Sequence, residues 1–133
     1  MYTIQAPKVL ILESQLIIAA DLSLQIARLG YEVMGIHARS EDALKTIAGN
    51  RPDIVLMNIN LPGMEERIRT AGVIWQGYRI PVVFLSAYTG RELCPHFIQH
   101  FPCAFISKPF KIRDLQSGLE AVLGRLATNH NPQ

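Results

Sequence analysis

Apolar residues recur along this chain in two alternating patterns, short continuous runs and stripes with helical spacing. The runs are bounded by turn residues or charges, which is typical of strands buried on both faces of a parallel sheet. The predicted strands cover residues 9–12, 31–37, 53–59, 80–85 and 103–107. The third run reaches the polar residue Asn58 before a turn at Pro62 and Gly63. Since ligands bind beyond the carboxyl ends of central strands in such sheets, Asn58 should face the binding crevice.

The stripes predict the helices that separate these strands. Residues 16–29 carry two stripes, which predicts a helix pressed between neighbours and ended by Gly30. The two stripes are Ile17, Ala20, Leu24 and Ala27 and, beside them, Ile18, Leu22, Ile26 and Leu29. Further helices are predicted over residues 40–49, with Ser40 as the N-cap, and over residues 66–76.

The carboxyl-terminal third is less regular. An amphipathic helix is predicted over residues 112–126, with Leu115, Leu119, Val122 and Leu126 on one face. Between the fourth and fifth strands, Pro95 favours a short helix that ends near Phe101 after a long loop. A helix that starts from a capping box at Thr89 and Glu92 is the alternative, but Pro95 would then lie inside it.

Strand and helix alternate five times with short links, which predicts right-handed crossovers and a parallel sheet with helices on both faces. The 133 residues have room for one such domain. We assign residues 1–127 to it and residues 128–133 to a polar tail.

Composition excludes several classes of protein. A hydrophobic content of 49% and a charged content of 18% are typical of a compact globular domain. The net charge of +2, with scattered Lys and Arg, gives no reason to expect nucleic acid as a partner. No apolar stretch is long enough for a membrane span, and the start has no signal-peptide pattern. Cys94 and Cys103 lack metal-ligand spacing, which fits a reducing cytoplasm.

Four sequence blocks together resemble the receiver domain of two-component response regulators. They are Val-Leu-Ile-Leu-Glu-Ser from Val9, Asp-Ile-Val-Leu-Met-Asn-Ile-Asn-Leu from Asp53, Pro-Val-Val-Phe-Leu-Ser-Ala-Tyr from Pro81 and Ser-Lys-Pro-Phe from Ser107. These blocks follow the family's order and spacing over about residues 8–126. The resemblance implies a flavodoxin-like (βα)5 fold, in which a doubly wound five-stranded parallel sheet has the strand order 2-1-3-4-5.

The resemblance also implies where a phosphorylation pocket should lie. In the family, two acidic residues after the first strand hold Mg²⁺, and an aspartate at the end of the third strand is phosphorylated. A hydroxyl residue ends the fourth strand, and a lysine precedes a proline after the fifth. By position, Glu13, Ser86 and Lys108 match this pattern, whereas Ser14 replaces the second acid and Asn58 replaces the phospho-acceptor. An amide is not a nucleophile, so we expect no phosphorylation at Asn58.

The substitutions also change the charge of the pocket. Three carboxylates and one lysine give a family site a charge of about −2, whereas Glu13 (−1) and Lys108 (+1) sum to zero. We therefore expect Mg²⁺ binding to be weak or absent, with Glu13 as the only metal ligand at most. No other cofactor is expected.

Each of these residues also has a purely structural interpretation. Ser14 could cap the first helix, and Glu13 could form an ion pair with Lys108. Ser86 could be an ordinary hydroxyl at the end of a strand. Phe105 matches the family's aromatic switch and should prefer the buried position, but it could equally be a core residue.

Two further features bear on partners. His96 and His100 lie four residues apart, a spacing that can bind zinc, but the favoured interpretation is a surface face with Phe97 and Phe101 that contacts a partner. Trp75 is interpreted as a packing residue.

The leading hypothesis is a stand-alone, degenerate receiver, or pseudo-receiver, in two-component signalling. It would act without enzymatic activity, by docking a histidine kinase or another regulator through its fourth helix, fifth strand and fifth helix. A homodimer is left open, and neither nucleic acid nor membrane is expected as a partner. The alternatives are an active phosphorelay receiver that uses Ser86 or another acceptor, and a flavodoxin-like binder of small molecules. The loop after the first strand, which begins with Glu13 and Ser14, offers an anionic ligand little.

Overall fold

The computed structural model describes residues 6–59, 63–86 and 103–129, with side chains up to residue 124. Five parallel strands form one sheet in the order β2-β1-β3-β4-β5, which confirms the fold implied by the resemblance. The strands are β1 (Lys8–Leu12), β2 (Glu32–His37), β3 (Ile54–Ile59), β4 (Val82–Ser86) and β5 (Cys103–Ser107).

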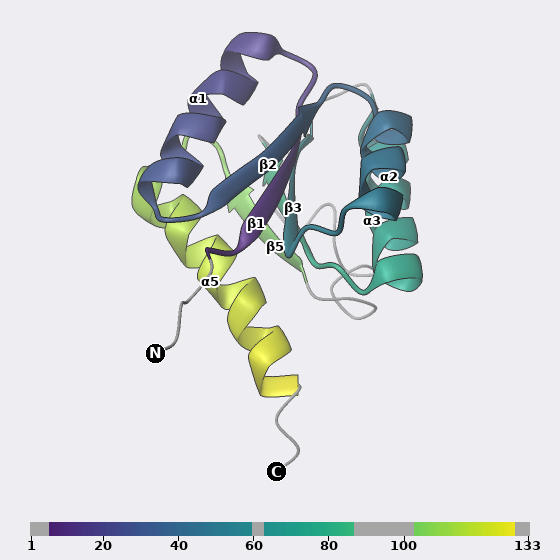
Figure 1. Ribbon diagram of the computed structural model, residues 1–133. Helices are drawn as coiled ribbons and strands as arrows, with labels where there is room; N and C mark the ends of the chain where they lie inside the picture. The colour runs from purple at the N-terminus through teal and green to yellow at the C-terminus, as the bar shows by residue number, and fades with distance from the viewer. Residues whose placement is uncertain (1–5, 60–62, 87–102, 130–133) are drawn as a thin grey trace.

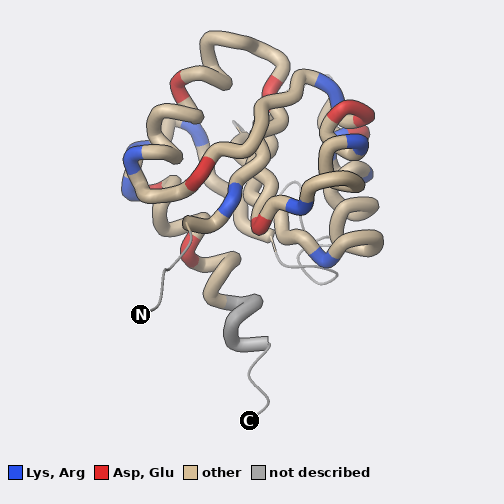
Figure 2. The backbone as a smooth tube through the Cα atoms, in the orientation of Figure 1, with Lys and Arg blue, Asp and Glu red and all other residues tan. Residues whose placement is uncertain are grey.

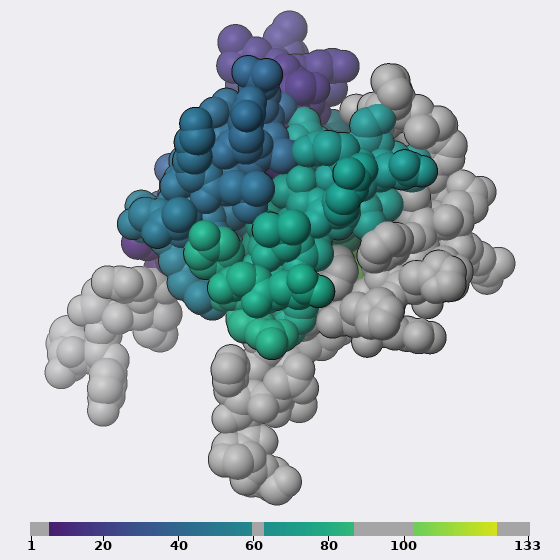
Figure 3. Space-filling view, turned by 90° about the vertical axis from the view of Figure 1, so that its right-hand side faces the viewer, coloured from purple at the N-terminus to yellow at the C-terminus, as the bar shows by residue number. Residues whose placement is uncertain are grey.

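Helices cover both faces of this sheet, as Figure 1 shows. α1 (Leu16–Arg28) and α5 (Ile112–Asn129) lie on one face, and α2 (Ser40–Gly49) and α3 (Met64–Tyr78) lie on the other. Figure 3 looks onto the second face, where α2 and α3 lie side by side. Figure 2 shows Lys and Arg interspersed with Asp and Glu on this side, so no single sign of charge dominates it.

Two apolar layers make the core, one on each face of the sheet. Residues of β3 alternate between them: Val55 and Met57 pack toward α2 and α3, while Ile54 and Leu56 pack toward α1 and α5. All six residues of β3 are buried, as expected for a central strand covered on both faces. Each fully buried Ile or Leu side chain contributes about 1.5–3 kcal/mol to stability relative to an exposed one.

The register of the strands places their carboxyl ends at one edge. Leu12 pairs with Met57, and Ile59 pairs with Ser86. Ser86 in turn pairs with Ser107. The residues that follow or end these strands, including Glu13, Asn58 and Lys108, therefore meet at the same edge of the sheet.

The prediction that both stripes of α1 are buried is wrong. Leu22 and Ile26, from the second stripe, are buried against the sheet. Ile17 and Leu24, from the first stripe, are 85% and 60% exposed. A helix that covers one face of a sheet packs against that face and presents its other side to solvent, so the first stripe of α1 faces outward.

The first turn of α2 also differs from the prediction. Ser40 is the first helical residue and not the N-cap, which is Arg39, and no side chain caps this helix. The hydroxyl of Ser40 instead accepts a hydrogen bond from Arg67 of α3. Gly30 follows α1 with a φ of 94°, so the predicted helix stop is confirmed at a backbone angle that favours glycine.

Other bounds differ by a few residues. The helix predicted over residues 66–76 extends at both ends to become α3, and α5 continues beyond residue 126 to Asn129. The predictions about Thr89, Glu92, Pro95 and Phe101 lie outside the described residues. Within the described ranges, no helix is both long and apolar enough to cross a membrane.

Candidate functional site

Three polar side chains form a continuous network at the carboxyl edge of the sheet. Asn58 lies in the middle, where its Nδ2 donates to Glu13 Oε1 and its Oδ1 accepts from Lys108 Nζ. Glu13 and Asn58 are only 3% and 5% exposed. An amide carries one donor group and one acceptor group, so Asn58 can satisfy a carboxylate and an ammonium at the same time.

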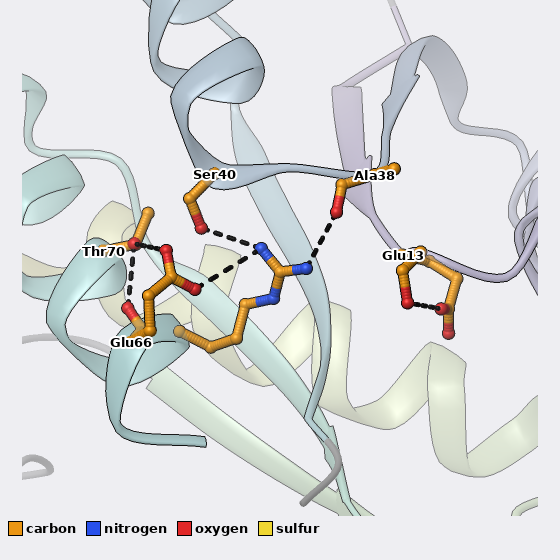
Figure 4. Close-up of polar contacts among 7 residues, drawn as sticks. Glu13, Ala38, Ser40, Glu66 and Thr70 are labelled. Atoms are coloured by element: carbon orange, nitrogen blue, oxygen red, sulfur yellow. Dashed lines mark hydrogen bonds and ion pairs between the residues drawn. The ribbon is translucent and has the colours of Figure 1, made fainter. Parts of the chain in front are cut away.

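The second oxygen of the Glu13 carboxylate holds the start of α1. Glu13 Oε2 accepts from the backbone N–H of Gln15 at 2.7 Å. It also accepts, over a longer 3.5 Å, from the hydroxyl of Ser14, the contact drawn beside Glu13 in Figure 4. A carboxylate is stabilised there because the amino end of a helix carries partial positive charge. Gln15 is the N-cap of α1 and no side chain caps it, so the interpretation of Ser14 as the cap is wrong.

Lys108 reaches the network from the segment after β5. Its backbone N–H donates to the carbonyl of Ser86 at 2.9 Å, which fixes the turn from which the side chain extends. Burial lowers the pKa of Lys108, and the negative charge of Glu13 opposes this shift. The peptide bond between Lys108 and Pro109 is cis.

Ser86 and Phe105 come from β4 and β5, the strands that follow β3 in the sheet. Ser86 is 1% exposed and ends β4, at the position expected for the family's hydroxyl. Phe105 is half-buried and stacks on Phe84, with the ring centroids 4.9 Å apart and the rings inclined by 22°. It packs against the core layer under α2 and α3.

The side-chain oxygens of this network do not suit Mg²⁺ as ligands. That ion requires six oxygen ligands in an octahedron and is usually held by one or two carboxylates. Here both oxygens of Glu13 accept hydrogen bonds from protein groups, and Asn58 Oδ1 faces an ammonium. Among the residues that the structure describes, no group of three His, Cys, Asp or Glu side chains could hold a metal. His96, His100, Phe97 and Cys94 lie outside this part of the chain.

A second polar cluster, which no sequence pattern predicts, joins α3 to the loop before α2 and to its first residue. Arg67 donates to Ser40 Oγ at 2.7 Å and to the carbonyl of Ala38 at 2.9 Å, and its guanidinium lies 3.7 Å from Glu66 Oε2. Figure 4 shows Ala38, Ser40 and Glu66 converging on this guanidinium. The partners lie 27 and 29 residues from Arg67 along the chain, so no local pattern could reveal them.

Comparisons with known proteins agree with this architecture. Residues 9–120 match the family described as the response regulator receiver domain. The chain is 30% identical over 118 residues to the transcriptional regulatory protein PdtaR of Mycobacterium tuberculosis, an alignment that covers 89% of this chain and 57% of PdtaR. The chain thus spans little more than half the length of this curated relative.

Solved structures give the same result. The signal receiver domain of a modulated diguanylate cyclase from Desulfovibrio desulfuricans superposes with a TM-score of 0.77 at 29% identity, covering 92% of this chain and 98% of that one. The anti-anti-sigma factor PhyR from Bartonella quintana superposes with a TM-score of 0.78 at 26% identity, covering 93% of this chain and 50% of that one. On its sequence match and its fold, the chain belongs to the response regulator receiver domain family.

Proposed function

We propose that this chain is a pseudo-receiver, a regulatory domain of two-component signalling that acts by docking a protein partner without being phosphorylated at Asn58. The observation that carries the proposal is the Asn58 amide between Glu13 and Lys108. It occupies the position where the family has its phospho-acceptor, and it offers no nucleophilic oxygen.

The network also supplies the charge balance that a metal would otherwise provide. Glu13 (−1) and Lys108 (+1) sum to zero, and Asn58 links them through one hydrogen bond to each. A dication therefore gains little from entering this site, and we expect Mg²⁺ to bind weakly or not at all. Without a phosphoryl group or metal to favour one state, the conformation is set by whichever partner binds one state more tightly.

The names of two relatives support a regulatory protein as the partner. PdtaR is described as a transcriptional regulatory protein and PhyR as an anti-anti-sigma factor. We propose that this chain likewise binds a regulatory protein, a histidine kinase or a second copy of itself in the cytoplasm, and catalyses no reaction. The docking face would include β5, which ends directly before Lys108, and α5, which begins four residues after it.

Intact mass spectrometry tests this function most directly. The full chain would be incubated with Mg²⁺ and acetyl phosphate beside the double variant Ser14→Asp, Asn58→Asp, which rebuilds the family's acidic set. We expect one added phosphoryl group on the double variant and none on the natural chain. Asn58→Ala serves as a control that removes the network without adding a carboxylate.

Two outcomes would contradict the proposal. A phosphoryl group on the natural chain would mean that another side chain, such as Ser86, accepts it. Failure of the folded double variant to take up a phosphoryl group would mean that the pocket is assigned wrongly.

A further inference from the structure

Apolar side chains of α1 remain exposed beside the polar network. Leu16, Ile17 and Leu24 are 79%, 85% and 60% exposed. Ile17 differs from Leu24 because it also forms part of the wall of a cavity. The cavity of about 530 Å³ lies between α1, the ends of β3 and β4, and the segment after β5.

The wall of this cavity is mainly apolar. Its apolar residues are Ile17, Ile18, Leu22, Leu85, Pro109 and Phe110. Its polar residues are Asp21, Asn58 and Lys108. Asn58 and Lys108 are hydrogen-bonded to each other and so share one end of the cavity, whereas Asp21 is exposed and bound by Gln25 of the same helix.

We propose that this cavity binds a small, uncharged and mostly apolar molecule with one hydrogen-bonding group. Its volume lies within the range of roughly 300–1,000 Å³ that is typical of ligand pockets, and such pockets combine apolar walls with a few polar groups. The apolar body of the ligand would contact Ile17 and Phe110. Its polar group would face Asn58 and Lys108.

Charge argues for a neutral ligand. Asp21 (−1) and Glu13 (−1), with Lys108 (+1), give a sum of −1 in and directly behind the wall. The ammonium of Lys108 already faces Asn58 Oδ1 and the charge of Glu13, so an anion would have to compete with these groups, and a cation would meet the ammonium itself at the polar end. The ligand site is independent of the proposed function, although a bound molecule would touch Asn58, the residue on which that function depends.

A matched pair of probes tests the site. The full chain, labelled with ¹⁵N, would be titrated with 2-naphthalenemethanol and, separately, with 2-naphthoate, which has the same ring system but a negative charge. We expect the alcohol to give saturable amide shifts around Ile17, Leu22 and Phe110. The carboxylate is expected to bind at least about fivefold more weakly.

A matched pair of variants locates the site on the cavity. Ile17→Ser and Leu24→Ser both replace an exposed apolar residue of α1, so neither should unfold the chain. Only Ile17 lines the cavity, so Ile17→Ser should weaken binding of the alcohol about fivefold or more, while Leu24→Ser should leave it within about twofold.

Three results would overturn the proposal. They are the absence of saturable shifts up to the solubility limit of the alcohol, equal weakening in both variants, and binding of the carboxylate as tight as that of the alcohol. A phosphoryl group found on the natural chain would contradict the proposed function but leave this binding result unchanged, so the two failures are distinguishable.

Discussion

Asn58 joins two side chains of opposite charge because its amide has a donor on one side and an acceptor on the other. An aspartate at this position would keep an acceptor for Lys108 but lose the donor to Glu13. Two carboxylates would then face each other at a site that is 5% exposed. A one-atom change in a side chain thus reverses the balance between attraction and repulsion in the network.

The loss of this donor predicts the effect of Asn58→Asp alone. We expect the free energy of unfolding at pH 7 to fall by about 1–3 kcal/mol, because Glu13 loses a buried donor and gains a repelling charge. Urea denaturation measures the change. Asn50→Asp, at an exposed position, provides the control and should cost about 0.5 kcal/mol or less. A stability equal to that of the natural chain would contradict the hydrogen-bonding pattern assigned to Asn58.

Lys108 supplies a pH-dependent prediction. Burial lowers its pKa from the ordinary value of 10.5, so the unfolded chain binds more protons than the folded chain as the pH approaches that value from below. The free energy of unfolding contributed by Lys108 therefore rises with pH in this window. The stability of the natural chain relative to Lys108→Met should increase from neutral pH toward pH 10.

Denaturation of the two chains in parallel at several pH values measures this difference. Tyr31, whose pKa is raised by burial and then by Glu120, destabilises the fold as the pH rises, but it is present in both chains and cancels. A difference that falls with pH would show that the charge of Glu13 outweighs burial at Lys108.

Besides the apolar core that they share, α2 and α3 are joined by polar contacts of Arg67 that neither helix reveals in its own sequence. Only 15% of the Arg67 side chain is exposed, and it donates to the carbonyl of Ala38 before α2 and to the hydroxyl of Ser40, the first residue of α2. Because α2 has no side-chain cap of its own, this contact organises its first turn.

We predict that Arg67→Gln lowers the free energy of unfolding by about 1–2 kcal/mol, since two hydrogen bonds from a charged donor are lost. Amide exchange in the first turn of α2 should accelerate at the same time. Arg69→Gln on the same helix changes an exposed residue and should alter stability by about 0.5 kcal/mol or less. Equal effects of the two substitutions would contradict a specific role for Arg67.

The helices and strands differ in how accurately their bounds and burial could be predicted from the sequence. β5 has the predicted bounds and β1 begins one residue earlier than predicted, because both are apolar runs with clear ends. The prediction that both stripes of α1 are buried was wrong, because periodicity identifies apolar stripes but does not show which of them contacts a neighbouring element. The resemblance to the receiver family implied that Glu13, Asn58 and Lys108 share one site. The direction of the Asn58 amide depends on the distances between three strands, which no local pattern contains.

For the molecule as a whole, the neutral network predicts that stability does not depend on Mg²⁺. A ligand that binds only the folded state raises stability by an amount set by its concentration relative to Kd, about 2.7 kcal/mol at 100 times Kd. We expect no shift in the Tm of the natural chain between EDTA and 10 mM Mg²⁺.

The double variant Ser14→Asp, Asn58→Asp should in contrast show a clear rise in Tm on addition of Mg²⁺, because it offers three carboxylates. Isothermal calorimetry of both chains provides an independent measure of Mg²⁺ uptake. Equal shifts in the two chains would mean that the metal binds elsewhere.

The bridging amide also bears on how this chain could change over evolutionary time. Asn58→Asp alone removes the donor to Glu13, and Ser14→Asp alone adds a carboxylate next to Glu13 while Asn58 still occupies the pocket. Each single step back toward the family pattern therefore increases repulsion before the second step can restore a metal site. If the proposed function holds, the network would oppose a stepwise return to the family's acidic set, most strongly at the buried Asn58 and less at the exposed Ser14.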